Sequence, residues 1–153
     1  MFHQVLWNLR FWKLVYKYYY IVMTIFSKII AGEIPCYKVA ENDDFFAFLD
    51  IRPLNAGHTL VVPKKEIDYL FDLDDTTLSM MIVFAKKVSV AIQKSIECNR
   101  VGLTVIGLEV PHAHIHLIPI NTESDMSFHK KRPEISPDEM KTIADKIQQN
   151  FHL

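Results

Sequence analysis

The sequence predicts an α+β fold in which five strands form an antiparallel layer accompanied by helices. Two observations predict this class. The expected elements follow in the order helix, three strands, long helix, two strands, helix. The connections between successive strands are short, which favours antiparallel pairing over the long crossovers that parallel strands need. With 153 residues and no second-domain boundary, the chain is expected to form one domain with a sizeable core.

The first half of this domain is expected to hold a short helix and three strands. Residues 26–31 predict the helix, which Gly32 closes. Residues 37–41 and 45–49 are apolar-rich strands separated by three polar residues, a spacing typical of a hairpin. Residues 59–63 are rich in β-branched side chains and predict the third strand.

A long amphipathic helix follows, with Asp74 or Asp75 as its N-cap and its end near Gln93. Apolar residues at helical spacing predict its buried face, namely Leu78, Met81, Ile82, Ala85, Val88 and Ile92. Residues 101–106 predict the fourth strand, and the fifth ends near Pro119. The last helix is expected over residues 136–150, because Ser136 is a good N-cap and Pro137 suits the first helical position.

Composition narrows the class of protein. Seventeen basic and eighteen acidic residues give a formal net charge of −1, which does not favour a nucleic-acid-binding surface. The two cysteines, Cys36 and Cys98, are far apart and form no C-x-x-C pair. They are expected to be small buried residues, and the chain is expected to be cytoplasmic, where thiols stay reduced.

Residues 1–22 differ from the rest of the chain. They contain both tryptophans and four of the six tyrosines, and no acidic residue precedes Glu33. No apolar run there approaches the ~20 residues that cross a bilayer. Three interpretations of residues 1–22 remain open: a membrane-surface helix, a partner-binding arm, or a segment that is not part of the natural protein. We expect Met23 to be the true start, with residues 1–22 not native or disordered and residues 23–153 forming the domain.

Three histidines occupy alternate positions, His112, His114 and His116, which we call the histidine triplet. In a β-strand, residues two apart share a face and lie ~6.6 Å apart along the strand. The three imidazoles are therefore expected on one face, with Ala113, Ile115 and Leu117 on the other. A packed strand that presents a row of imidazoles indicates a chemical site at a cleft.

Three blocks in this sequence resemble the histidine triad (HIT) family of nucleotide-binding hydrolases and transferases, closest to its small protein-kinase-C-interacting, or Hint-like, branch. They are residues 25–35, residues 47–53 with 57–64, and residues 107–119. The resemblance implies a five-stranded antiparallel sheet with the long helix packed on it. It also implies a homodimer formed through that helix and the strand before the triplet.

The resemblance further implies attack on the α-phosphate of a nucleoside phosphoramidate, an adenylylated amine or a dinucleoside polyphosphate, without a cofactor. His114 would be the nucleophile and form a covalent nucleotidyl-histidine. His116 would contact phosphate oxygens or help to protonate the leaving group, and His112 would support the geometry. His58 would help to set the tautomers.

The substrate-binding residues are also implied by resemblance. Asp50 would accept hydrogen bonds from the ribose hydroxyls. Apolar residues would surround a purine base, namely Phe26, Ile29, Ile51 and Leu60. Backbone N–H groups would stabilise the phosphate charge in the turn formed by Gly107, Leu108, Glu109 and Val110.

Several positions depart from the family pattern. Leu108 stands where many members have glutamine, and Glu109 stands where a small hydroxyl residue is common. Ile120 replaces a frequent arginine, and Ser27 occupies one place where some members have zinc-binding cysteines. These departures affect the phosphate clamp more than the nucleophile.

Two other functions remain open at this point. Three histidines on a strand can also bind zinc and leave an open coordination position, which would make the protein a metal enzyme. Alternatively, the altered clamp would leave a nucleotide-binding protein with little catalysis.

Overall fold

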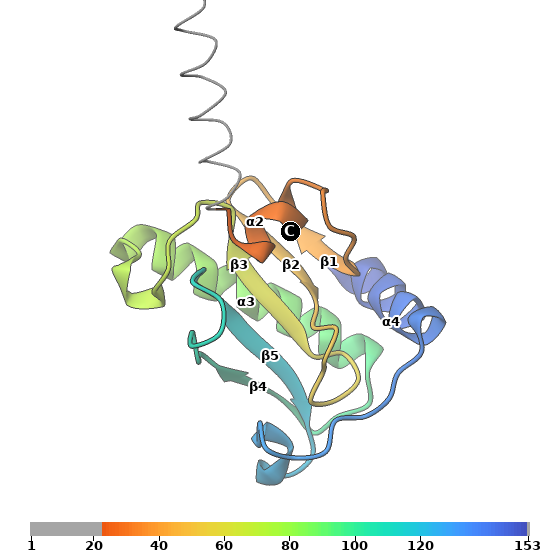
Figure 1. Cartoon of the computed structure of the whole chain (residues 1–153). Helices are drawn as coiled ribbons and strands as arrows, with labels where there is room; N and C mark the ends of the chain where they lie inside the picture. The colour runs from red at the N-terminus through yellow and green to blue at the C-terminus, as the bar shows by residue number, and fades with distance from the viewer. Residues whose placement is uncertain (1–22, 153) are drawn as a thin grey trace, which may run out of the picture.

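Five strands form one antiparallel sheet, as the sequence predicts, and their order in the sheet is β1-β2-β3-β5-β4 (Figure 1). The computed structural model describes residues 23–152, so the expected segment 1–22 lies outside the described residues. The strands are β1 (Lys38–Glu41), β2 (Phe45–Leu49), β3 (Thr59–Pro63), β4 (Arg100–Thr104) and β5 (Ile115–Ile120). The helices are α2 (Ile25–Ile30), η1 (Leu70–Asp72), α3 (Asp75–Ser95), η2 (Glu123–Met126) and α4 (Pro137–Asn150).

Helices cover both faces of the sheet, with α2 in front and α3 and α4 behind (Figure 1). Strand β2 is buried along its whole length because its side chains alternate between two apolar clusters. Phe45, Ala47 and Leu49 join the large core on the α3 side. Phe46 and Phe48 join a smaller cluster on the α2 side. The smaller cluster is the one that lies next to the histidine triplet.

The long helix begins where the sequence predicts, since the Asp74 side chain accepts from the N–H of Thr77 at 2.9 Å. Its predicted buried face is partly wrong, because Ile82 is 43% exposed whereas Phe84 and Ala91 are buried. At about 100° per residue, Ile82 lies well around the helix from the stripe that includes Met81, while Phe84 and Ala91 lie within it. The spacing of apolar residues alone did not fix which side of the helix faces the sheet.

The connection from β5 to α4, residues 121–136, contains η2 and then runs past the loop between β2 and β3 (Figure 1). It ends at Ser136, which caps α4 and forms a capping box with Glu139. Among residues 23–152, none of the helices is long and apolar enough to cross a membrane.

Candidate active site

The histidine triplet lies at the start of β5, and only His116 is inside the strand. The expectation that all three histidines lie on a strand is therefore wrong. Pro111 has no N–H to contribute to a ladder, and the N–H of His112 turns back to the carbonyl of Val110 at 2.8 Å. The chain pairs with β3 only from Ile115 onwards.

The three imidazoles nevertheless share one side of the chain, as predicted. The alternating residues Ala113, Ile115 and Leu117 belong to the core on the α3 side. The rings of His112 and His114 each meet Phe26 of α2 edge-on, at centroid distances of 5.8 and 5.2 Å. The His116 ring lies 4.9 Å from that of His114. The triplet is therefore a continuous row of imidazoles beside α2.

The backbone fixes the tautomer of His114. Its Nδ1 lies 2.7 Å from the carbonyl oxygen of His112, and a carbonyl only accepts, so Nδ1 carries the proton. Nε2 therefore holds the lone pair and has no hydrogen-bond partner within residues 23–152. Every fully buried side-chain nitrogen or oxygen in that range has a partner, so this Nε2 reaches the surface. An accessible imidazole lone pair is what a nucleophilic histidine requires.

His58 and His116 form a buried pair whose hydrogen bonds also define their tautomers. The N–H of Leu54 donates to Nδ1 of His58 at 3.0 Å, so the His58 proton is on Nε2. That Nε2–H donates to Nδ1 of His116 at 3.0 Å. The His116 proton is consequently on Nε2, where it is a hydrogen-bond donor beside the His114 ring.

Both imidazoles of this pair are neutral at physiological pH. Burial lowers the pKa of His58 to about 4 and that of His116 to about 3. The charge of Arg132 acts in the same direction on both values, whereas Asp50 opposes the pKa shift of His58. Although Oδ2 of Asp50 lies 3.7 Å from Nδ1 of His58, that nitrogen already accepts from a backbone N–H, so the contact is not an ion pair.

His112 connects the triplet to α2. Its Nε2 donates to the carbonyl of Pro63 at 2.8 Å, so its Nδ1 accepts from the hydroxyl of Thr24, also at 2.8 Å. Thr24 is the N-cap of α2 as well, and its Oγ1 accepts from the N–H of Ser27 at 3.1 Å. Burial lowers the pKa of His112. One hydroxyl thus caps the start of α2 and also donates to the imidazole whose tautomer the Pro63 carbonyl fixes.

Ser27 and Glu66 complete this network. The Ser27 hydroxyl donates to the Glu66 carboxylate, which also accepts from the N–H of Thr24 at 3.2 Å. Sequence reasoning missed Thr24 and Glu66. Thr24 carries a recognisable signal, a threonine directly before an apolar helix. Glu66 carries none, because its role depends on a contact with a residue 42 positions away.

The predicted apolar wall forms except at one position. Phe26, Ile29 and Leu60 are buried in the cluster on the α2 side, and Val110 packs against it. Ile51 is 74% exposed and does not join this wall, because the chain bends directly after β2. The wall therefore consists of α2 and β3 rather than of the loop after β2.

Asp50 begins the loop between β2 and β3. Its Oδ1 accepts from the N–H of Arg52 at 2.8 Å, so one carboxylate oxygen caps the loop. Its Oδ2 is the oxygen that faces His58. The side chain is 19% exposed and lies at the rim of the site.

The turn predicted to clamp phosphate is open. Gly107 has a φ of +69°, a conformation that favours glycine. Leu108 is 88% exposed and Glu109 is exposed as well, so neither side chain is held against the site. Only backbone N–H groups of this turn are suited to a phosphate, and the turn provides no positive charge.

The structure does not arrange the triplet as a three-histidine metal site. Both ring nitrogens of His112 and Nδ1 of His114 already have hydrogen-bond partners. In the described part of the chain, potential ligand atoms within 4.8 Å of one another occur in the group Asp50, His58 and His116. Both nitrogens of His58 are occupied in the hydrogen bonds above. The triplet therefore gives no support to the zinc alternative.

A five-stranded antiparallel sheet with an alternating histidine row beside a short helix is the arrangement expected of a histidine triad protein, and comparison with known proteins agrees. The HIT domain family matches residues 31–123, and the chain belongs to this family. An uncharacterized HIT-like protein of Borreliella burgdorferi is 34% identical over 135 residues, 83% of this chain and 97% of that protein.

Two further matches extend this result. Adenosine 5'-monophosphoramidase hnt1 of Schizosaccharomyces pombe is 35% identical over 125 residues, 80% of this chain and 94% of that protein. The crystal structure of a HIT-like protein from Bartonella henselae, involved in cell-cycle regulation, has a TM-score of 0.72 and 32% identity. That match covers 84% of this chain and 96% of the other.

Proposed function

We propose that this protein is a nucleotidyl hydrolase or transferase whose nucleophile is Nε2 of His114. The observation that carries the proposal is the hydrogen bond from Nδ1 of His114 to the His112 carbonyl, which leaves the lone pair on an accessible Nε2. Membership of the HIT family and a relative named as an adenosine 5'-monophosphoramidase support a nucleotide substrate from which AMP is transferred.

The reaction has two steps. Nε2 of His114 attacks the α-phosphorus, and the bond from phosphorus to the leaving nitrogen or oxygen breaks with its electron pair staying on the leaving atom. A leaving nitrogen takes up a proton from solvent, whereas a leaving phosphate oxygen departs as an anion. Water then attacks phosphorus and gives up a proton to solvent, the N–P bond breaks, its electrons return to Nε2, and AMP is released. The imidazolium of the intermediate keeps its Nδ1–H on a backbone carbonyl, which stabilises the positive charge. The Nε2–H of His116 donates to a phosphate oxygen as charge develops there.

The nucleoside is expected to lie along the α2 side of the sheet. Phe26, Ile29 and Leu60 provide an apolar wall suited to a purine face. Oδ2 of Asp50 is placed at the rim to accept from ribose hydroxyls. With both cysteines present as free thiols, we propose that this reaction takes place in the cytoplasm.

Covalent trapping tests the mechanism. Wild-type protein is incubated with labelled AMP-phosphoramidate, quenched in base and digested, and the peptides are fragmented by mass spectrometry. A nucleotidyl group should be found on His114 and should be lost in acid. Incubation with AMP alone is the control and should give no adduct. A label on another residue would contradict the proposal.

We also propose that the protein is a homodimer formed through α3 and β4. The outer side of α3 exposes four apolar side chains at 42–55% exposure, namely Met80, Ile82, Val83 and Val90. Strand β4 is an edge of the sheet, and its Leu103 is 49% exposed. An apolar helix stripe beside an unpaired edge strand is a surface that proteins normally cover.

Val83→Glu is expected to convert the dimer to a monomer, because it places a charge in the centre of that stripe. Light scattering coupled to size-exclusion chromatography measures the mass. Val83 is 55% exposed, so the fold of the subunit should be retained. Gln149→Glu on exposed α4 is the control and should stay dimeric. A wild-type protein that is monomeric at high concentration would refute this assembly.

A further inference from the structure

A basic cavity lies next to the His58–His116 pair. It is an open cavity of about 450 Å³ between the turn at Leu54 and Asn55 and residues 130–134 of the β5–α4 connection. Three cationic side chains line it, Lys130, Lys131 and Arg132, against a single acidic one, Glu134. A concave surface with this charge balance attracts anions.

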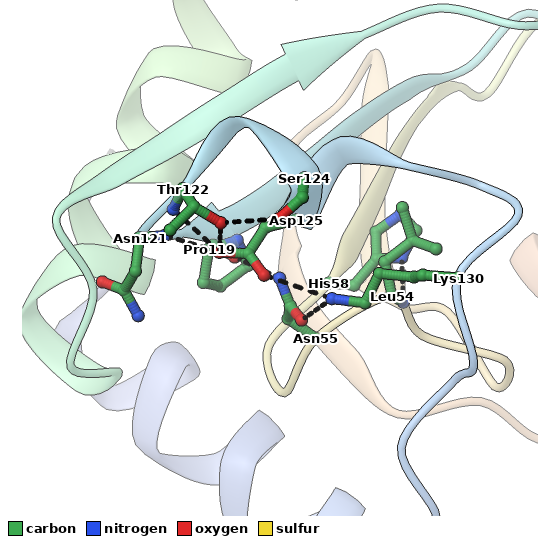
Figure 2. A network of polar contacts seen from close by, with 9 residues as sticks. All are labelled: Leu54, Asn55, His58, Pro119, Asn121, Thr122, Ser124, Asp125 and Lys130. Atoms are coloured by element: carbon green, nitrogen blue, oxygen red, sulfur yellow. Dashed lines mark hydrogen bonds and ion pairs between the residues drawn. The ribbon is translucent and has the colours of Figure 1, made fainter.

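The first wall of this cavity is the turn that holds His58. Figure 2 shows Leu54 and Asn55 beside His58, with Lys130 reaching across from the β5–α4 connection. Leu54 donates its N–H to Nδ1 of His58, and the carbonyl of Asn55 accepts from the N–H of His58 at 3.0 Å. The cavity is therefore one residue removed from the imidazole pair of the site.

The second wall also touches the site. Phe128, two residues before Lys130, meets the His116 ring edge-on at a centroid distance of 5.3 Å. The charge of Arg132 is close enough to lower the pKa of both His58 and His116. Arg132 also donates to the backbone carbonyl of Arg52, which holds it against the loop that follows Asp50.

Hydrogen bonds hold this second wall in place, as Figure 2 shows. Nζ of Lys130 donates to Oδ1 of Asn55 at 2.7 Å and to Oδ1 of Asp125 at 3.2 Å. Oδ2 of Asp125 accepts from the N–H groups of Asn121 and Thr122. The charge of Lys130 is thus balanced by Asp125, and its hydrogen bonds hold the β5–α4 connection against the turn at Asn55. Lys131 and Arg132 are the cationic side chains of the cavity that could bind an anionic ligand, and Glu134 is the acidic side chain that opposes them.

Arginine suits a phosphate particularly well. A guanidinium has five N–H donors in a planar fork, and the contact with Arg52 uses the Nη1 group of Arg132. By contrast, the turn at Gly107–Val110 offers the exposed Leu108 and the carboxylate of Glu109. The positive charge beside the His58–His116 pair therefore comes from the β5–α4 connection and not from that turn.

We propose that this cavity binds the phosphate chain of the leaving group, with Arg132 and Lys131 as its ligands, so that a nucleotide with an oligophosphate leaving group is the preferred substrate class. This inference rests on the proposed function. In the first step the N–P bond to His114 forms while the bond from the α-phosphorus to the bridging oxygen breaks. The electron pair stays on that oxygen, and the oligophosphate departs as an anion into the basic cavity.

An anionic leaving group is consistent with a site whose His58–His116 pair is neutral. An amine must gain a proton in order to leave, whereas an oligophosphate leaves as an anion and needs none. Because the pKa values of His58 and His116 lie at about 4 and about 3, neither imidazole carries a spare proton at neutral pH. A fixed cation does for an anionic leaving group what a general acid does for an amine.

Kinetics with two substrates test the subsite. In the Arg132→Gln and Lys131→Gln variants, kcat/KM for diadenosine tetraphosphate should fall at least about tenfold, the loss expected for a charged hydrogen bond. For AMP-phosphoramidate, which lacks the chain, the loss should be several times smaller. Lys131 is exposed, so its variant should fold even if the Arg132 variant does not. Lys146→Gln on α4 removes the same charge on the other side of the sheet and outside the proposed dimer surface, and should leave both values unchanged.

Calorimetric titration with inorganic tripolyphosphate measures the affinity of the cavity for a phosphate chain independently of catalysis. The Arg132 and Lys131 variants should bind it at least about tenfold more weakly than the wild type and Lys146→Gln. Equal losses on the two substrates, or tripolyphosphate binding that does not change in the variants, would overturn the subsite. A wild-type protein that hydrolyses neither substrate but binds tripolyphosphate with this sensitivity would contradict the proposed function and support the subsite.

Discussion

His114→Asn is expected to lower kcat for AMP-phosphoramidate by about 10⁴-fold, the scale of loss when a covalent nucleophile is removed. The asparagine amide occupies the place of Nδ1 and retains a donor for the carbonyl of His112. It has no counterpart of Nε2, the nitrogen proposed to bond to phosphorus. Because the packing beside Phe26 is largely kept, AMP should bind with a Kd within about threefold of the wild type.

Steady-state hydrolysis and calorimetric binding of AMP measure the two halves of this prediction. His152→Asn, at an exposed position near the end of the described chain, is the matched control and should keep full activity. Circular dichroism and the Tm should show that both variants are folded. If His114→Asn retained a tenth of the wild-type kcat, Nε2 of His114 would not be the nucleophile.

The second large effect concerns stability below neutral pH. The free energy of unfolding should fall by about 4 kcal/mol between pH 7 and pH 5, because His58 and His116 are buried as neutral imidazoles. In the unfolded chain a histidine takes up a proton near pH 6.5, whereas in the folded protein the pKa values are about 4 and about 3. The unfolded state therefore binds more protons throughout this range, so acidification favours unfolding. The Tm should drop by roughly 10 °C.

Denaturant unfolding at several pH values measures this dependence. His58→Gln removes one of the buried neutral imidazoles and should reduce the slope of stability against pH by at most about half, because His112, whose pKa burial also lowers, still contributes. The variant should be less stable at pH 7 because Leu54 loses its acceptor. His129→Asn changes an exposed histidine and should leave the slope as it is. A free energy of unfolding that stays constant from pH 7 to pH 5 would show that the buried pair is not neutral.

Local sequence signals were sufficient to predict an element where residues adjacent in the sequence determine its bounds. Strands β2 and β3 were predicted at their observed bounds, because aromatic and β-branched runs bounded by polar turns leave few alternatives. Ser136 with Glu139 set the start of α4 for the same reason. The shared face of the histidine triplet also followed from its alternation, even though only His116 lies inside β5.

The orientation of elements against one another was less predictable. Ile82 and Phe84 are both apolar, and only packing against the sheet decided which one is buried. Ile51 matched an apolar wall position, but a bend after β2 exposes it. A pattern of residue types shows the spacing of apolar residues along an element, but it does not show which other element they will pack against.

The sequence by itself determined the antiparallel α+β class and the row of three imidazoles on one side of the chain, because both depend on spacing along the backbone. Only the tertiary structure decided which ring nitrogen carries each proton. The carbonyl of His112 fixes the proton of His114 on Nδ1, and the carbonyl of Pro63 fixes that of His112 on Nε2. The N–H of Leu54 fixes the proton of His58 on Nε2, and His58 in turn fixes that of His116. Tautomers are set by hydrogen-bond partners, and those of His112 and His116 lie on other segments of the chain.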